Sequence, residues 1–159
     1  MDSILRRKFL EVAEIVLENF SGRTSKSEGC YICLMTKEPK IVLVVEVGDC
    51  SSKESLKFCQ EKALRVQEFD LISSWQNRDR DKGQYGGAIG APACSLGLAI
   101  GHDMIISVSG FSELEDEAFA LVVALALKWI TEDDISRIAS ISDNSVVYRL
   151  IKACAELFE

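Results

Sequence analysis

The stretch that decides the fold is residues 86–117, GGAIGAPACSLGLAIGHDMIISVSGFSELEDE. Residues 91–100 are expected to form a strand, although their glycines weaken it or mark bulges. Residues 104–109, MIISVS, include three β-branched apolar residues, which predicts a second strand after a tight turn at 101–103. Ser112 with Glu115 three residues later is a capping box, which predicts a helix over residues 113–130. A hairpin followed by a helix is typical of an antiparallel sheet with helices packed against it.

The residues before this stretch predict a helix and another pair of strands. Apolar side chains three to four residues apart indicate an amphipathic helix over residues 4–20. Two apolar runs, residues 30–36 and 41–47, are joined by Lys-Glu-Pro-Lys, which predicts a hairpin with a proline turn. Because residues 41–45, IVLVV, are continuously apolar, we expect them to lie in a central strand covered on both faces.

Further helices are predicted from their start signals. Ser51 with Glu54 forms a capping box that begins a helix ending near residue 68. Thr131 with Asp134, and then residues 143–144, indicate two helices that continue to the end of the chain. The order of elements therefore predicts the α+β class, with a mainly antiparallel sheet flanked by helices and an extra C-terminal helical tail.

Composition and charge limit the classes of partner. A chain of 159 residues with 48% hydrophobic side chains is long enough to bury a core in one domain. A net charge of −7 argues against nucleic acid and against an anionic membrane surface. The N-terminus has no secretory pattern, and the longest apolar run, 118–127, is shorter than the about 20 residues of a membrane span. We therefore expect a cytoplasmic protein whose six cysteines are reduced.

Three short motifs carry a family resemblance. They are Gly86-Gly87-Ala88-Ile89, the strand 105–110 that ends in Ser-Gly, and the helix start Glu115-Asp116-Glu117-Ala118. Together they resemble the GlcG/HbpS family, which includes the C-terminal domain of PduO-type proteins, and they are closest to a bacterial and fungal branch of it. Lys62-Ala63 is similar to a Lys-Ala pair in the family's serine-rich helix.

The resemblance covers residues 29–130 and leaves residues 131–159 as a helical extension of a single domain over 1–159. It implies a profilin-like fold, homo-oligomers in rings or stacked rings, and haem as a possible cofactor, because some members bind haem. An Arg-Met-Asp-Gly-Ala-like segment of the family is absent; Gly48-Asp49-Cys50 stands in its place.

Four residues are candidates for a ligand site: Gly86, Gly87, Gly90 and His102. The glycines either allow a bulge or a close backbone contact, or expose backbone as the wall of a ligand site. His102 is the only histidine, so it is either an exposed turn residue or a ligand for haem or a metal. A hydrolase-like enzyme with Cys94 or Ser109 as the nucleophile and His102 as the base is the weakest alternative, because the first glycine of a nucleophile elbow is missing.

Two other motifs are interpreted as structural. Cys30 and Cys33 form a C-x-x-C, but on a strand these positions point to opposite faces, so we predict no metal site. The acids at 113–117 are predicted to cap the helix and to be solvated, with a partner's basic surface as the alternative; they would repel a phosphate.

The helix at 118–127 is apolar on all sides, so more than one of its faces must be covered. Either the C-terminal tail or a neighbouring subunit could cover the second face. For a neighbouring subunit, the interface residues would be Phe119, Val122, Leu125 and Trp129. We therefore expect a non-catalytic, homo-oligomeric module that binds a small-molecule ligand or another protein, with a haem or small-molecule carrier as the alternative.

Overall fold

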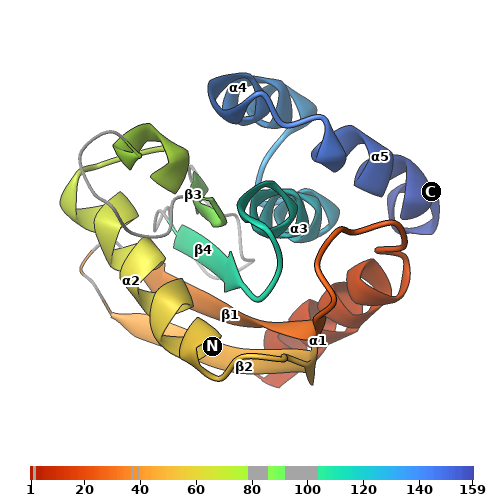
Figure 1. Cartoon of the computed structure of the whole chain (residues 1–159), viewed down its shortest axis with the longest axis horizontal. Coiled ribbons are helices and arrows are strands. Elements are labelled where there is room, and N and C mark those ends of the chain that lie inside the picture. The colour runs from red at the N-terminus through yellow and green to blue at the C-terminus, as the bar shows by residue number, and fades with distance from the viewer. Residues whose placement is uncertain (2, 37, 39, 79–85, 92–103) are drawn as a thin grey trace.

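The computed structural model describes residues 1, 3–36, 38, 40–78, 86–91 and 104–159. The described residues form the following elements, in chain order (Figure 1): α1 (Ser3–Glu18), β1 (Glu28–Thr36), β2 (Ile41–Asp49), α2 (Glu54–Glu68), the 3-10 helix η1 (Ser74–Asn77), β3 (Ala88–Ala91), β4 (Met104–Ser109), α3 (Glu113–Ala126), α4 (Glu132–Ser142), α5 (Val146–Ala153) and the 3-10 helix η2 (Ala155–Phe158). The predicted α+β class, with an antiparallel sheet flanked by helices and a C-terminal helical tail, is confirmed.

The described strands form one antiparallel sheet in the order β2-β1-β4-β3. In the pairing of β1 with β4, Tyr31 lies opposite Ser109 and Thr36 opposite Met104. The predicted hairpin of 30–36 with 41–47 is the pair β1–β2. The strand that pairs with the far edge of β4 is β3, which ends at Ala91, where the strand predicted over residues 91–100 would begin. Beyond Ala91, residues 92–100 of the strand predicted before β4 lie outside the described residues.

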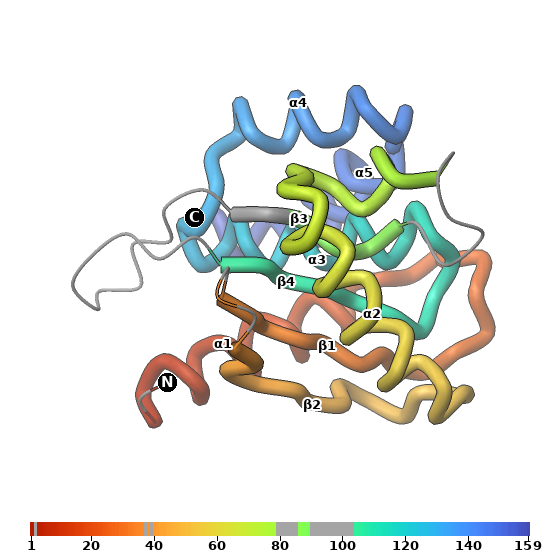
Figure 2. Tube along the Cα trace, turned by 90° about the vertical axis from the view of Figure 1, so that its left-hand side faces the viewer, coloured from red at the N-terminus to blue at the C-terminus, as the bar shows by residue number. Residues whose placement is uncertain are grey.

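The two faces of the sheet are covered by different helices (Figure 2). Along β1, Cys30, Ile32 and Leu34 belong to the hydrophobic cluster that includes α1 and α3. The alternate residues Tyr31, Cys33 and Met35 belong to the cluster that includes α2. The prediction that Cys30 and Cys33 point to opposite faces is therefore confirmed.

The prediction that residues 41–45 lie in a central strand is wrong. The strand with neighbours on both edges and buried side chains on both faces is β1, whereas β2 is paired only with β1. Residues 41–47 are apolar except for Glu46, yet Ile41 is 47% exposed and Val42, Val44 and Val45 are only half-buried. The strand β2 therefore has the hydrophobic composition of an inner strand but lies at the edge of the sheet.

The apolar helix α3 is covered within the chain. The sheet lies on one side of α3, while α1 and the C-terminal helices lie on the others (Figure 1). Phe119, Val122 and Trp129 are buried, and Trp129 stacks on Phe9 of α1 with 5.9 Å between ring centroids. Of the two alternatives, cover by the tail is therefore the one present. These three side chains are not available to a neighbouring subunit; Leu125 is half-buried.

The helix starts differ in how they are capped. Thr131 and Asp134 form the predicted capping box. Ser112 is the N-cap of α3, but its hydroxyl donates to the Glu115 carboxylate rather than accepting from the backbone. The capping box predicted at Ser51 is wrong, because α2 begins at Glu54 after Lys53. No helix in the described part of the chain has the length and hydrophobicity that crossing a bilayer requires.

Candidate ligand pocket and sheet edge

Gly86 and Gly87 lie in a tightly packed part of the fold. A Cβ on Gly86 would overlap the carbonyl of Glu113, and a Cβ on Gly87 would overlap the carbonyl of Val108. Gly87 also has φ of 108°, which favours glycine. Both residues are buried, so their close approach is to the protein's own backbone. Gly90 pairs with Ile105 in the β3–β4 ladder, and His102 lies outside the described residues.

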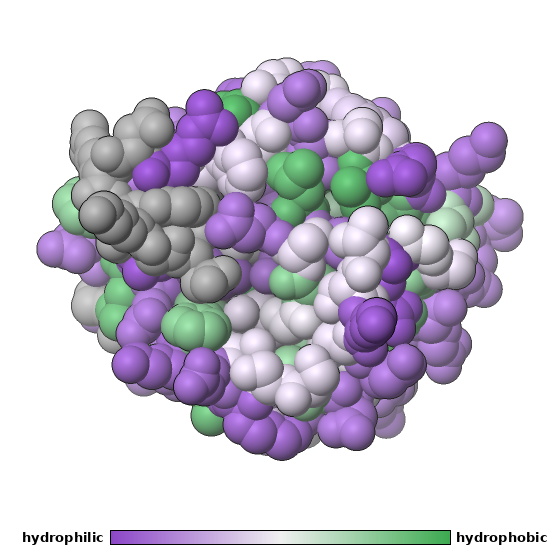
Figure 3. Space-filling view, viewed as in Figure 1, coloured by the Kyte–Doolittle hydropathy of each residue, from purple (hydrophilic) through white to green (hydrophobic). Residues whose placement is uncertain are grey.

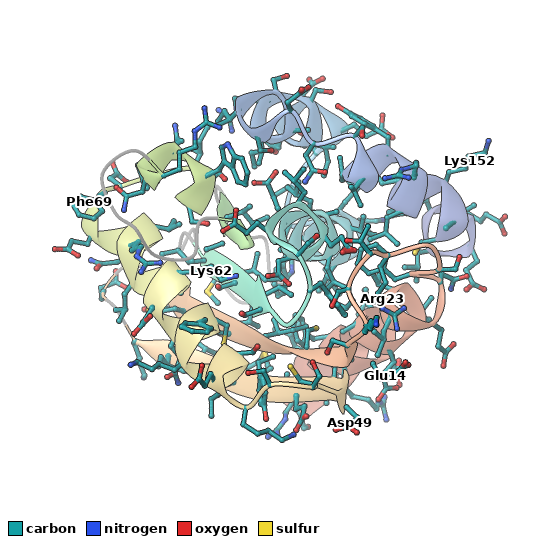
Figure 4. The ribbon with its side chains drawn as sticks, viewed as in Figure 1. Glu14, Arg23, Asp49, Lys62, Phe69 and Lys152 are labelled. Atoms are coloured by element: carbon teal, nitrogen blue, oxygen red, sulfur yellow. The ribbon has the colours of Figure 1, made fainter. Side chains whose placement is uncertain are left out.

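The carbonyl of Gly86 accepts a hydrogen bond from a buried lysine, Lys62, which Figure 4 labels on α2. Lys62 of α2 is 0% exposed, and its Nζ donates to Gly86 O at 2.7 Å and to Asp116 Oδ2 at 3.1 Å. The second oxygen of Asp116 accepts from the backbone N–H of Phe111. Burial raises the pKa of Asp116 to about 7, although Lys62 and that N–H oppose the rise. Lys62 and Asp116 therefore link α2, α3 and the segment that precedes β3.

Glu115 organises the loop between α1 and β1. Its carboxylate accepts from the backbone N–H groups of Thr24 and Ser25, and from the hydroxyls of Thr24 and Ser112. Burial alone would raise the pKa of Glu115, but these hydrogen bonds outweigh it and lower the pKa. Glu115 is therefore an anion whose acceptor positions are occupied by its own chain.

Glu117 joins the start of α3 to two other segments. It accepts hydrogen bonds from Ser73 before η1, and from Ser142 and Asn144 at the end of α4. Burial raises its pKa, and these hydrogen bonds oppose the rise. The prediction that the acids at 115–117 are solvated is therefore wrong, since all three are buried and bind distant parts of the chain. Sequence spacing at a helix start cannot reveal partners that lie so far away in the chain.

The described cysteines are free thiols in buried positions. Burial raises the pKa of Cys33 to about 11 and that of Cys59 to about 12. Thiols with such pKa values are protonated at neutral pH and are poor nucleophiles. Ser109 is buried on β4, while Cys94 and His102 lie outside the described residues. Of the hydrolase candidates, only Ser109 is therefore among the residues that the structure describes.

A cavity of about 280 Å³ lies where the C-terminal tail meets the rest of the fold. Its walls come from residues 19–24 after α1, from the start of α3, and from α5. Apolar side chains, including Phe20, Val146 and Leu150, make up much of the lining, and Arg23 and Arg149 are its basic residues. In the space-filling view, hydrophobic residues are visible between the C-terminal helices and α3 amid hydrophilic surface (Figure 3). Sequence reasoning missed this cavity, because its three walls are far apart in the chain.

The free edge of β2 is the second exposed feature. No described strand pairs with this edge, and β2 is the outermost strand in both ribbon views (Figures 1 and 2). Its one acid between residues 41 and 47, Glu46, accepts from the Lys53 ammonium at 2.8 Å. Unpaired backbone groups beside apolar side chains form a template for another strand.

Comparison with solved structures identifies the class of fold. The chain is 17% identical to HbpS of Streptomyces reticuli, solved as a double mutant. The alignment covers 80% of this chain and 86% of the HbpS chain, with a TM-score of 0.56. It is 11% identical to PduOC, solved as a complex with heme. This alignment covers 82% of the present chain and 95% of the PduOC chain, with a TM-score of 0.57. No protein-family model and no curated protein matches the sequence.

The protein is therefore an α+β protein with the fold of HbpS and PduOC. The resemblance to the GlcG/HbpS family that its motifs predict is confirmed at the level of the fold. The cavity at the tail lies partly outside the residues that carry this resemblance, because α5 follows residue 130.

Proposed function

We propose that the protein is a non-catalytic, homo-oligomeric protein-interaction module that assembles through the free edge of β2. The observation that carries this proposal is the mismatch between the composition of β2 and its position. An apolar, β-branched strand is typical of the inside of a sheet, yet β2 has a neighbour on one side only. A strand from a second copy would give β2 the second neighbour that its composition fits.

A second copy is favoured because β2 is complementary to itself. In an antiparallel pair related by a two-fold axis, Val44 can lie opposite the copy's Val44. Val42 then lies opposite Glu46, and Lys40 lies opposite Gly48, so no like charges face each other. Such a pair is isologous, with each strand supplying the same surface. A ring, as the family resemblance implies, would require a second and different contact.

The absence of catalysis is a proposal supported by the described nucleophiles. The thiols of Cys33 and Cys59 are buried and protonated, and the carboxylates of Asp116 and Glu117 bind the protein's own groups. All four of these side chains are buried.

Light scattering after gel filtration tests the assembly. Wild type is expected to elute as an oligomer, and Ile41→Lys is expected to shift it toward the monomer because edge lysines oppose strand pairing. Leu64→Lys is the matched control, since Leu64 has a similar exposed fraction, 45%, but lies on α2. A monomeric wild type, or equal effects of the two substitutions, would contradict the proposal.

Haem carriage is the second candidate, favoured by the likeness to a domain solved with heme. The cavity at the tail does not fit haem, because its volume is about 280 Å³ and no histidine is among its lining residues. His102 would have to supply the ligand. In an absorbance titration, a sharp Soret shift that His102→Ala weakens would support haem binding, and an unchanged broad band would remove it.

A further inference from the structure

The cavity between the tail and the rest of the fold has a distinct pattern of polar groups. Its carboxylate, Glu115, already accepts hydrogen bonds from Thr24, Ser25 and Ser112. It is buried and holds the loop that forms one wall. The main acceptor in the lining is therefore engaged by the protein itself and is not open to a ligand.

The basic residues of the lining keep donors available. Arg23 is fixed in place, because its Nε donates to Ser27 O and its Nη1 donates to Phe20 O. Its guanidinium has further N–H groups, and Nη2 forms an ion pair with Glu28 at 3.5 Å. The Glu28 side chain is 80% exposed, so this pair is open to solvent. Arg149 of α5 makes no hydrogen bond or ion pair with any described residue and stands exposed at the cavity.

The rest of the lining is largely apolar. Phe20, Leu114, Val146 and Leu150 come from three separate segments and surround the space. A volume of about 280 Å³ lies near the lower end of the range for small-molecule sites, about 300–1,000 Å³. A small apolar body would fit, with its polar end directed at the arginines.

We propose that this cavity binds a small monocarboxylate with an apolar body, through Arg149 and Arg23. A carboxylate accepts from guanidinium groups in a charge-assisted pair. A doubly charged phosphate is disfavoured, because Glu115 lines the cavity and Glu113 and Asp116 lie in the same helical turn. The site belongs to the tail as much as to the rest of the fold, and it does not depend on assembly through β2.

The test uses benzoate and its neutral, nearly isosteric analogue benzamide, titrated into the full chain and followed by NMR amide shifts. Benzoate is expected to bind saturably and at least about ten-fold more tightly than benzamide, as a charged hydrogen bond implies. Arg149→Gln is expected to weaken the binding of benzoate by a similar factor while leaving the binding of benzamide unchanged.

The matched control is Lys152→Gln, which removes the same charge from the same helix. Lys152 is not in the lining, and Figure 4 shows it pointing outward from α5. Ala153→Trp, which fills the cavity, should abolish binding of both compounds. No saturable binding of benzoate, equal binding of the two compounds, or equal effects of Arg149→Gln and Lys152→Gln would overturn the proposal. The oligomeric state measured on the same samples reports on the proposed function separately.

Discussion

At the scale of single residues, we expect the largest loss of stability when the interaction between Lys62 and Asp116 is removed. Replacing Lys62 with Met leaves Asp116 as a buried carboxylate with only the Phe111 N–H as a partner. Removing one member of a buried ion pair typically costs about 3–5 kcal/mol. We therefore expect Lys62→Met to lower the free energy of unfolding by about that amount in a urea titration carried out above the pKa of Asp116, where its carboxylate is charged.

The double variant Lys62→Met with Asp116→Asn is the control for this effect. The asparagine side chain would keep an acceptor for the Phe111 N–H but would carry no charge, so part of the lost stability should return. A double variant no more stable than Lys62→Met alone would show that the charge of Asp116 is not the cause.

The raised pKa of Asp116 also predicts how the stability of the protein changes with pH. Its pKa is raised to about 7, whereas an unfolded aspartate titrates near about 4. Between these values the native state keeps a proton that the unfolded chain has released. The contribution of Asp116 to stability is therefore full at low pH, falls as pH rises from about 4 to about 7, and stays constant above that. The free energy of unfolding of wild type minus that of Asp116→Asn should fall across this window; a flat difference would contradict it.

At the scale of elements, α5 is expected to contribute to stability through one face. Leu150 is 3% exposed in the cluster that covers α3, whereas Tyr148 on the same helix is 50% exposed. Leu150→Ala should lower the free energy of unfolding by about 2–5 kcal/mol. Tyr148→Ala should change it by no more than about 0.5 kcal/mol. Equal effects in thermal or urea unfolding would mean that α5 is not packed as described.

The order of helices and strands could be predicted from the sequence because it depends on local patterns. The capping box at Thr131 and the apolar run at residues 30–36, which forms most of β1, are examples of such patterns. The edge position of β2 could not be predicted, since hydrophobicity reports burial of side chains and not pairing of backbone groups. The roles of Glu115 and Glu117 could not be predicted either. Their partners, such as Thr24 and Ser142, become neighbours only through the tertiary fold.

At the scale of the whole molecule, net charge and self-association act against each other. Each copy carries a formal charge of −7, so two copies repel each other at low ionic strength. Salt screens that repulsion, with a Debye length of about 30 Å at 0.01 M and about 8 Å at 0.15 M. The proposed β2 dimer should therefore dissociate less at the higher of these two salt concentrations. Sedimentation at the two salt concentrations measures this, and weaker association in salt would contradict an apolar interface.

The placement of α5 has a consequence for the dynamics of the tail. Because α5 is one wall of the cavity, a ligand held there can bind only while the tail is docked. Ligand binding and docking of the tail are then thermodynamically coupled, so each stabilises the other to the same extent. The last turns of the chain should thus exchange their amide hydrogens more slowly whenever the cavity is filled, while the amides of β1 keep their rates.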